Sequence, residues 1–520
     1  MRVPDWCLCA RENPDSNAYD QPISKSVLLV VATLFAFSVA PTFISYQPYF
    51  FQWDDSDYFA RAIGVSLALW ARDSKELVAL MVSHHPPAMT LLGVPWGPLE
   101  SWDAAGKCFV TLAAVISLLA VISLYLLLRI GVKPVYLVVA SVCVGISLGP
   151  YPPGASAHLA STAFMADSLF AWAALAAVLL IPFEARTHTN TRRGSIVRGL
   201  LWGFILSLGT MAKLSFLYFV VLIVPTLFFM KVRRDAVRSA LTALIALIGC
   251  SSPLSLYLLR WGRHSFFLAK ASAFGGIAGF YYSPLLQFLG GTVRESPGMG
   301  ISFLLTVLAL LYVLIKGNLR ELWPEILALL IMVGFGITVL VSPNREIRFS
   351  FPLIITLPFL AAIFLSGKGQ SVPTRTATVC AALVFCGLFV AGVPTRHRPD
   401  WRSFGRCNAV LDTVGRLHAG TILLATDSPT LNAQLMSVAG LYASRPANIY
   451  SLAYQVMGGA TLEEDLRQMS LADVVVFQDR PALSPPFTNQ RVSEYEQYAR
   501  QVGLGPIRVG EDISVYVMRH

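Results

Sequence analysis

Long apolar runs recur along most of the chain, separated by short polar segments. The runs that are long enough to cross a bilayer cover residues 26–45, 107–128, 134–150, 162–182, 236–256, 301–316, 323–342, 350–366 and 376–393. Lipid accepts only helices or closed barrels as spanning structures, and these runs lack the alternation of barrel strands. They therefore predict transmembrane helices.

A further apolar stretch, residues 197–230, is too long for one span and short for two full ones. Lys213 lies near its middle. We therefore expect two helices that turn near Lys213 at the outer surface, which brings the expected number to about eleven.

Composition supports this interpretation. Of 520 residues, 55% are hydrophobic and only 13% are charged, whereas soluble domains carry about 25% charged residues. The predicted fold class is a polytopic α-helical membrane protein. Basic residues exceed acidic ones by 40 to 30, but many of them lie in short loops between apolar runs. That distribution is a topology signal and does not indicate a nucleic-acid partner.

The basic loops predict orientation and domain limits. They place a short N-terminal arm, residues 1–25, in the cytoplasm and the first outer loop, residues 46–106, outside. The transmembrane module then covers residues 26–393, and the chain's C-terminal part lies outside. We expect the cytoplasmic membrane of a bacterium, with the endoplasmic reticulum as the alternative.

After residue 393 the pattern changes to short β-type runs alternating with helical ones. The expected strands lie within 421–427, 447–452, 473–479 and 513–519, and the expected helices near 428–441, 461–470 and 491–503. This alternation predicts a small extracytoplasmic α/β domain at residues 394–520.

Within the first outer loop, residues 58–82 predict one amphipathic helix that lies on the membrane surface. Just before it, Asp54, Asp55 and Asp57 stand within four positions. Such carboxylates could deprotonate an acceptor hydroxyl or share a divalent cation. The plainer explanation is a solvated helix start, where acids favour the helix dipole, and Asp57 fits it best.

Two charges fall inside predicted spans. Asp167 lies about one turn into the fourth helix, where an unpaired charge costs up to about 2.5–3.5 kcal/mol at the bilayer centre and less near its surface. Lys213 carries a similar cost, so the two could pair. The pair would then be structural, or part of a polar site.

Two other outer segments complete the polar features. His85, Pro86 and Pro87 form an extended turn without two amide donors, which could equally be a plain loop. Arg345 and Arg348 stand at the outer mouth of the tenth helix and would share a helical face. Two guanidinium groups at headgroup level suit a phosphate ligand, with snorkelling toward headgroups as the alternative.

Together these motifs resemble the GT-C superfamily of integral-membrane glycosyltransferases. The resemblance is to the family 39-like branch, which contains protein O-mannosyltransferases and the lipid A aminoarabinose transferase. Its D-E-x-x-Y motif matches Asp54-Asp55-x-x-Tyr58 with Asp for Glu, and its H-P-P-L motif matches His85-Pro86-Pro87 with Ala88 for Leu. The later motifs match Asp167, Lys213 and Arg348-Phe349-x-x-Pro352, in the same order over roughly residues 50–360.

The resemblance implies transfer of a sugar from a polyprenyl or dolichyl phosphate carrier to a lipid, glycan or protein acceptor outside the cytoplasm. It implies that Asp54, or else Asp55, is the base, that Asp167 orients the acceptor or Lys213, and that Lys213, Arg345 and Arg348 bind the donor phosphate. Tyr58, His85, Pro86 and Pro87 would shape the site. No cofactor is expected, although the acidic cluster leaves a divalent cation open.

Two other classes of protein deserve comparison. A transporter or lipid flippase would place charges near mid-membrane on several helices and show a repeat between its halves. Here the charges lie at the outer rim, and no repeat is evident. A catalytically inactive, glycan-binding membrane scaffold would keep the fold without the chemistry, which the intact Asp54 and Arg348 argue against.

Overall fold

The structure is a computed structural model of the whole chain. It describes residues 24–39, 53–81, 86–92, 103–148, 166–186, 192–230, 297–316, 322–341, 347–367, 371–392, 402–428, 430–442, 447–452, 460–479 and 491–519, with isolated positions between them. The predicted helix at 236–256, and the residues His85 and Arg345, lie outside these described ranges.

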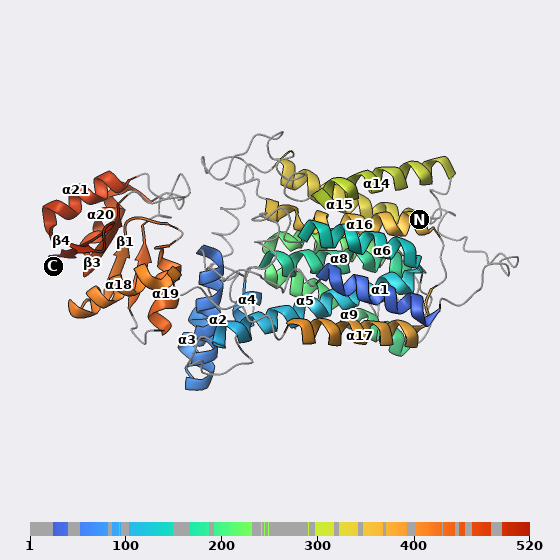
Figure 1. Ribbon diagram of the computed structural model, residues 1–520, viewed down its shortest axis with the longest axis horizontal. Coiled ribbons are helices and arrows are strands. Elements are labelled where there is room, and N and C mark those ends of the chain that lie inside the picture. Colours follow the sequence, from blue (N-terminus) through green and yellow to red (C-terminus); the bar gives the residue numbers. More distant parts are fainter. Residues whose placement is uncertain are drawn as a thin grey trace, which may run out of the picture.

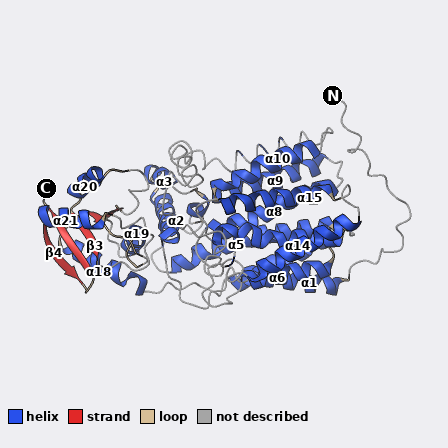
Figure 2. Cartoon of the chain, turned by 90° about the horizontal axis from the view of Figure 1, so that it is seen from above, coloured by secondary structure: helices blue, strands red, loops and turns tan. Residues whose placement is uncertain are grey.

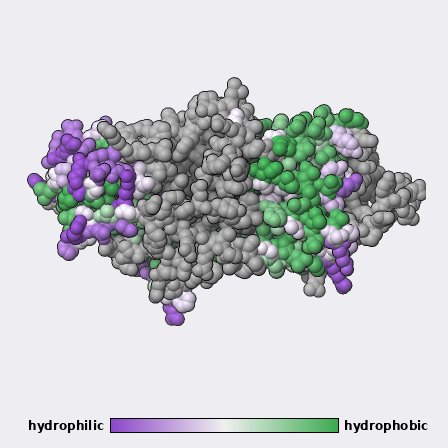
Figure 3. All heavy atoms as spheres, in the orientation of Figure 1, coloured by the Kyte–Doolittle hydropathy of each residue, from purple (hydrophilic) through white to green (hydrophobic). Residues whose placement is uncertain are grey.

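Apolar helices form a bundle in which most of the predicted spans are found. The helices are α1 (Lys25–Val39), α5 (Asp103–Ile130), α6 (Pro134–Leu148), α8 (Ala166–Arg186), α9 (Arg192–Ala212), α10 (Leu217–Met230), α14 (Pro297–Lys316), α15 (Trp323–Val341), α16 (Phe351–Ser366) and α17 (Thr374–Gly392). Within the described part of the chain, three of them contain stretches long and apolar enough to cross a membrane: Val110–Ile130, Ala166–Arg186 and Trp323–Val341. The surface of the bundle is strongly hydrophobic (Figure 3). The chain is an integral membrane protein.

Helix α8 is the centre of the bundle (Figure 2). Every residue from Ala166 to Glu184 is buried, and the helix packs against α5, α9, α10, α15 and α16. Its many alanines allow neighbouring backbones to approach closely, as is common between membrane helices. Residues near either end of α8 therefore lie beside several other helices.

The stretch 197–230 is broken as expected. Helix α9 ends at Ala212, Lys213 is extended with φ −148° and ψ 135°, and a 3₁₀ turn, η4 (Leu214–Phe216), leads into α10. The prediction of two helices with Lys213 at the turn is confirmed.

At the opposite end of α8, buried charges join several helices. Arg186 pairs with Glu325 at 2.7 Å and also donates to the carbonyl oxygens of Ile130 and Gly367. Nearby, Glu184 accepts from Arg198 and from the indole of Trp202. These contacts join α8 to α9, to the start of α15, to the last residue of α5 and to the residue after α16.

The surface helix expected at 58–82 is wrong in detail. The chain forms α2 (Trp53–Ala71) and α3 (Ser74–Met81), with Arg72 in the left-handed region at φ 56° between them. Asp73 starts α3, because its side chain accepts from the amides of Lys75 and Glu76. Helix α2 crosses the end of the bundle at a steep angle to the bundle helices (Figure 1).

The pattern of this segment predicts an apolar face that includes Ile63, Leu67 and Trp70. Ile63 is buried as expected, but Leu67 and Trp70 are exposed, and Phe59, Ala62 and Val65 are also buried. The reason is tertiary: α2 packs against the short helix α4 (Ala88–Leu91) and against a helix of the C-terminal part of the chain.

The residues after 401 form an α/β unit with a five-stranded sheet in the order β2-β1-β3-β5-β4. Its helices are α18 (Arg402–Arg416), α19 (Ala433–Tyr442), α20 (Leu462–Ser470) and α21 (Val492–Val502). Its strands are β1 (Thr421–Leu424), β2 (Asn448–Ser451), β3 (Val474–Gln478), β4 (Gly503–Val509) and β5 (Ile513–Met518). Strands β1, β2 and β3 are parallel, and β5 runs antiparallel to β3 and β4.

All four expected strands and all three expected helices are present in this unit. Helix α18 and strand β4 are additional to the prediction. Strand β4 reads "GLGPIRV", and its glycines and proline are typical of turns and edge strands, which hides it from propensity arguments. The unit has a largely hydrophilic surface (Figure 3).

Helix α19 of the α/β unit packs against α2. Buried side chains of α19, such as Leu435 and Val438, belong to one apolar cluster with Phe59 and Ala62 of α2. The α/β unit is therefore joined to the membrane module through α2 (Figure 1).

Candidate functional site

Three of the polar features expected at the outer face meet at one end of the bundle. Here α8 begins, α9 ends at Ala212 just before Lys213, and the 3₁₀ turn η5 (Ile347–Ser350) leads into α16. At this junction Lys213 contacts both Asp167 and Phe349.

Asp167 and Lys213 form an ion pair. The Nζ atom of Lys213 lies 2.5 Å from Oδ1 of Asp167, and the two side chains are 21% and 3% exposed respectively. The carboxylate is thus buried, while the lysine side chain is partly exposed. A buried pair of this kind makes each partner costly to remove alone.

Phe349 places the last motif beside this pair. Nζ of Lys213 lies 4.9 Å from the centre of the Phe349 ring, within the range of a cation–π contact. Arg348 precedes Phe349 in η5, and Pro352 follows at the start of α16, where its fixed φ favours the first turn. Arg348 is therefore the chain neighbour of the residue whose ring contacts Lys213, and its side chain lies outside the described part.

Local packing holds the backbone of Lys213 in place. Its amide donates to Gly209 and its carbonyl accepts from Phe216. The Phe216 ring is fully buried among Phe170 and Phe219. Gly209 is required here, because a Cβ atom at this position would overlap the Phe216 ring.

Gly209→Ala is therefore expected to displace Phe216 and destabilise the protein by about 1–3 kcal/mol, the usual cost of overpacking a core. The measurement is thermal unfolding of the purified protein in detergent. Gly415→Ala is the control, since a Cβ at Gly415 in α18 meets nothing within 4 Å. It should be neutral or slightly stabilising. Equal effects of the two substitutions would contradict the packing argument.

The acidic motif lies on α2. Asp54 and Asp55 are in its first turn by their backbone positions, and their side chains lie outside the described part. Asp57 was expected at the start of a helix but lies inside α2, where it pairs with Arg61 one turn later at 2.7 Å. Tyr58 is buried.

The proline motif comes next to α9. Pro86 is half-buried and Pro87 is buried, and the carbonyl of Pro87 accepts from Leu91 in the first turn of α4. Helix α4 packs against both α2 and α9. The two prolines therefore lead directly into α4, the short helix that contacts both the acidic helix α2 and α9.

Sequence reasoning missed two contributors to this site. Phe349 lies within the Arg348-Phe349-x-x-Pro352 motif, but the spacing of Phe349 and Lys213 along the chain gives no sign of their contact. Gly209 precedes Lys213 by four residues. The need for glycine there comes from the Phe216 ring, which lies after the turn and is not evident from the sequence around Gly209. Across the described residues, no group of three His, Cys, Asp or Glu side chains is placed to hold a metal ion.

Comparison with known proteins yields matches among solved structures. No family model matches the chain, and no curated protein matches it either. The archaeal oligosaccharyltransferase AglB from Archaeoglobus fulgidus, in complex with an inhibitory peptide and a dolichol-phosphate, aligns over 87% of this chain and 69% of its own, with a TM-score of 0.50 and 14% identity. Its apo form aligns over the same shares with a TM-score of 0.50 and 12% identity.

ArnT from Cupriavidus metallidurans in the apo state aligns over 94% of this chain and 97% of its own, with 14% identity and a TM-score of 0.49. The fold is inferred from the AglB match, which has the higher TM-score. At 14% identity this match shows a common fold and does not establish a common activity. The chain therefore shares the fold of the oligosaccharyltransferase AglB, in agreement with the fold that its motif resemblance implies.

Proposed function

We propose that this protein is a glycosyltransferase that moves a sugar from a polyprenyl or dolichyl phosphate carrier to an acceptor hydroxyl. The observation that carries the proposal is the Asp167–Lys213 pair beside Phe349, at the end of the bundle crossed by α2. A cation, a buried acid and an acidic helix meet there, as a phosphate-leaving reaction requires.

The base is Asp54, with Asp55 as its rival, because a transferred hydroxyl must lose its proton to a nearby carboxylate. Their place in the first turn of α2 puts them on the helix that crosses the bundle end. Tyr58, buried one turn later, and the segment His85-Pro86-Pro87 fix how that helix enters the site.

The donor phosphate is bound by Lys213, Arg345 and Arg348. A lysine ammonium has three N–H donors, and Asp167 takes one of them. Asp167 thus orients Lys213, while the remaining donors can meet phosphate oxygens. A single displacement with one base inverts the anomeric centre, and no cofactor is required.

The fold match supports this class of reaction by analogy, since AglB is described as an oligosaccharyltransferase bound to a dolichol-phosphate. The acceptor is a lipid, glycan or protein. We place the reaction at the outer face of a bacterial cytoplasmic membrane, with the N-terminus inside and the α/β unit outside.

The test is donor consumption by the purified wild-type protein in detergent, with a panel of radiolabelled polyprenyl-phosphate sugars and with and without EDTA. We expect one donor to be consumed and its turnover to persist in EDTA. Loss of turnover in EDTA alone would assign a divalent cation to the acidic cluster. If no donor is consumed and labelled lipid crosses a proteoliposome bilayer instead, the protein is a flippase.

A further inference from the structure

A second polar site lies in the α/β unit, at the carboxyl ends of β1 and β3. After β1 the chain forms β2 on one side of β1, and it then crosses over to form β3 on the other side of β1. In open α/β sheets, ligands bind at such a switch point, in the crevice beyond the carboxyl ends of the two strands.

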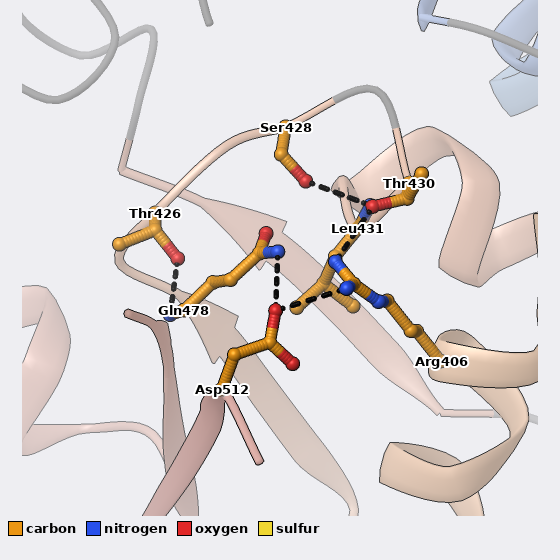
Figure 4. A network of polar contacts seen from close by, with 7 residues as sticks. All are labelled: Arg406, Thr426, Ser428, Thr430, Leu431, Gln478 and Asp512. Atoms are coloured by element: carbon orange, nitrogen blue, oxygen red, sulfur yellow. Dashed lines mark hydrogen bonds and ion pairs between the residues drawn. The ribbon is translucent and has the colours of Figure 1, made fainter. Parts of the chain in front are cut away.

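Polar side chains from four segments meet at this point (Figure 4). Asp512, in the turn between β4 and β5, accepts from the Nε2 atom of Gln478 at 3.0 Å and from Arg406 at 3.1 Å. Arg406 also donates to the hydroxyl of Thr430, which lies 3.5 Å from that of Ser428. The network therefore joins α18, the loop after β1, the end of β3 and the β4–β5 turn.

Gln478 is the unusual member of this network. It is only 5% exposed, and its Oε1 atom accepts no hydrogen bond from any residue that the structure describes. The amide cannot be reversed without cost, because its nitrogen faces the Asp512 carboxylate. A buried acceptor left without a donor is destabilising, and a ligand hydroxyl at this position would supply the missing donor.

We propose that this cluster binds the hydroxyl groups of a neutral sugar. Gln478 offers an unused acceptor, and the hydroxyls of Ser428 and Thr430 both donate and accept. Asp512 and the fully buried Asp427 oppose a phosphate or carboxylate ligand, and Arg406 is already paired with Asp512. A nucleotide is therefore a poor fit, and an uncharged polyol is a good one.

The position of the site indicates which substrate the bound sugar belongs to. The loop after β1, with Ser428 and Thr430, leads directly into α19, which packs against α2. A glycan held here would lie on the side of the α/β unit that joins the acidic helix. Its assignment as the acceptor glycan rests on the proposed function, but sugar binding by the cluster does not.

The test uses the full chain in lipid nanodiscs, because sugar-headed detergents would compete. Binding is measured by saturation-transfer NMR with a panel of neutral saccharides of one to six hexose or pentose units. We expect at least one to bind, and Gln478→Met to weaken it at least tenfold. Thr430→Val, at an exposed position, should also weaken it and replaces Gln478→Met if that variant does not fold.

Two control variants separate this site from the membrane site. Gln501→Met makes the same change at an exposed position on α21 and should bind as the wild type does, and so should Asp167→Asn. Absence of binding to the wild type would overturn the proposal, as would full binding by the folded Gln478→Met and Thr430→Val. Binding lost in Asp167→Asn but kept in Gln478→Met would place the sugar in the membrane site, leaving the proposed function intact.

Discussion

Asp54→Asn is expected to lower sugar transfer by about 10²–10⁴-fold, the usual contribution of a general base. The amide keeps the size of the side chain but cannot take the proton of an acceptor hydroxyl. The measurement is the initial rate with the donor identified for the wild type, with donor binding measured separately. Binding should change little, because the carboxylate acts on the acceptor and not on the donor phosphate.

Asp57→Asn is the matched control for this substitution. It lies on the same helix and removes the same charge, but Asp57 pairs with Arg61 and is not expected to touch the acceptor. Its rate should stay within a few fold of the wild type. If Asp55→Asn and not Asp54→Asn abolishes transfer, the base is Asp55. Full activity in both would contradict a base on α2.

Lys213→Met is expected to reduce both stability and transfer. It leaves the Asp167 carboxylate buried without its partner, and removing one member of a buried pair typically destabilises by about 3–5 kcal/mol. If Lys213 also binds the donor phosphate, transfer should fall by at least about a hundredfold in the fraction that remains folded. Thermal unfolding and the rate per folded molecule are the two measurements.

The double variant Asp167→Asn/Lys213→Met separates structure from chemistry. Replacing both charges removes the unpaired carboxylate, so the melting temperature should recover most of what Lys213→Met loses. Transfer should stay low, because no ammonium group remains for the phosphate. Recovery of both stability and transfer would mean that the pair is structural only.

The sequence predicts well what depends on neighbours along the chain. The break at Lys213 follows from the length of the apolar stretch and the charge at its middle. The strands of the α/β unit follow from runs such as "VVVF" of β3. By contrast, β4 contains residues that disfavour strands, and the division of α2 from α3 depends on one left-handed residue, Arg72.

What depends on partners far along the chain could not be predicted in the same way. Asp167 and Lys213 are the exception, because each is costly alone in a membrane and the two could therefore pair, as a structural pair or as part of a polar site. Arg186 and Glu325 also form a pair. Each of them had several oppositely charged residues as possible partners in the sequence, so this particular pair could not be predicted. The burial of α2 against α19 had no signal at all, since an amphipathic surface helix and a protein-covered one have the same pattern.

The contact between α2 and α19 has a consequence for the order in which the protein is made. Residues of α2 emerge from the ribosome near the beginning of synthesis, and those of α19 near its end, with the whole bundle between them. The apolar side chains of α2 that α19 covers therefore have no partner during most of translation. The acidic helix α2 reaches its final position only after the last part of the chain has been synthesised and folded. A product truncated before residue 433 would contain every membrane motif and would still lack α19, which covers α2.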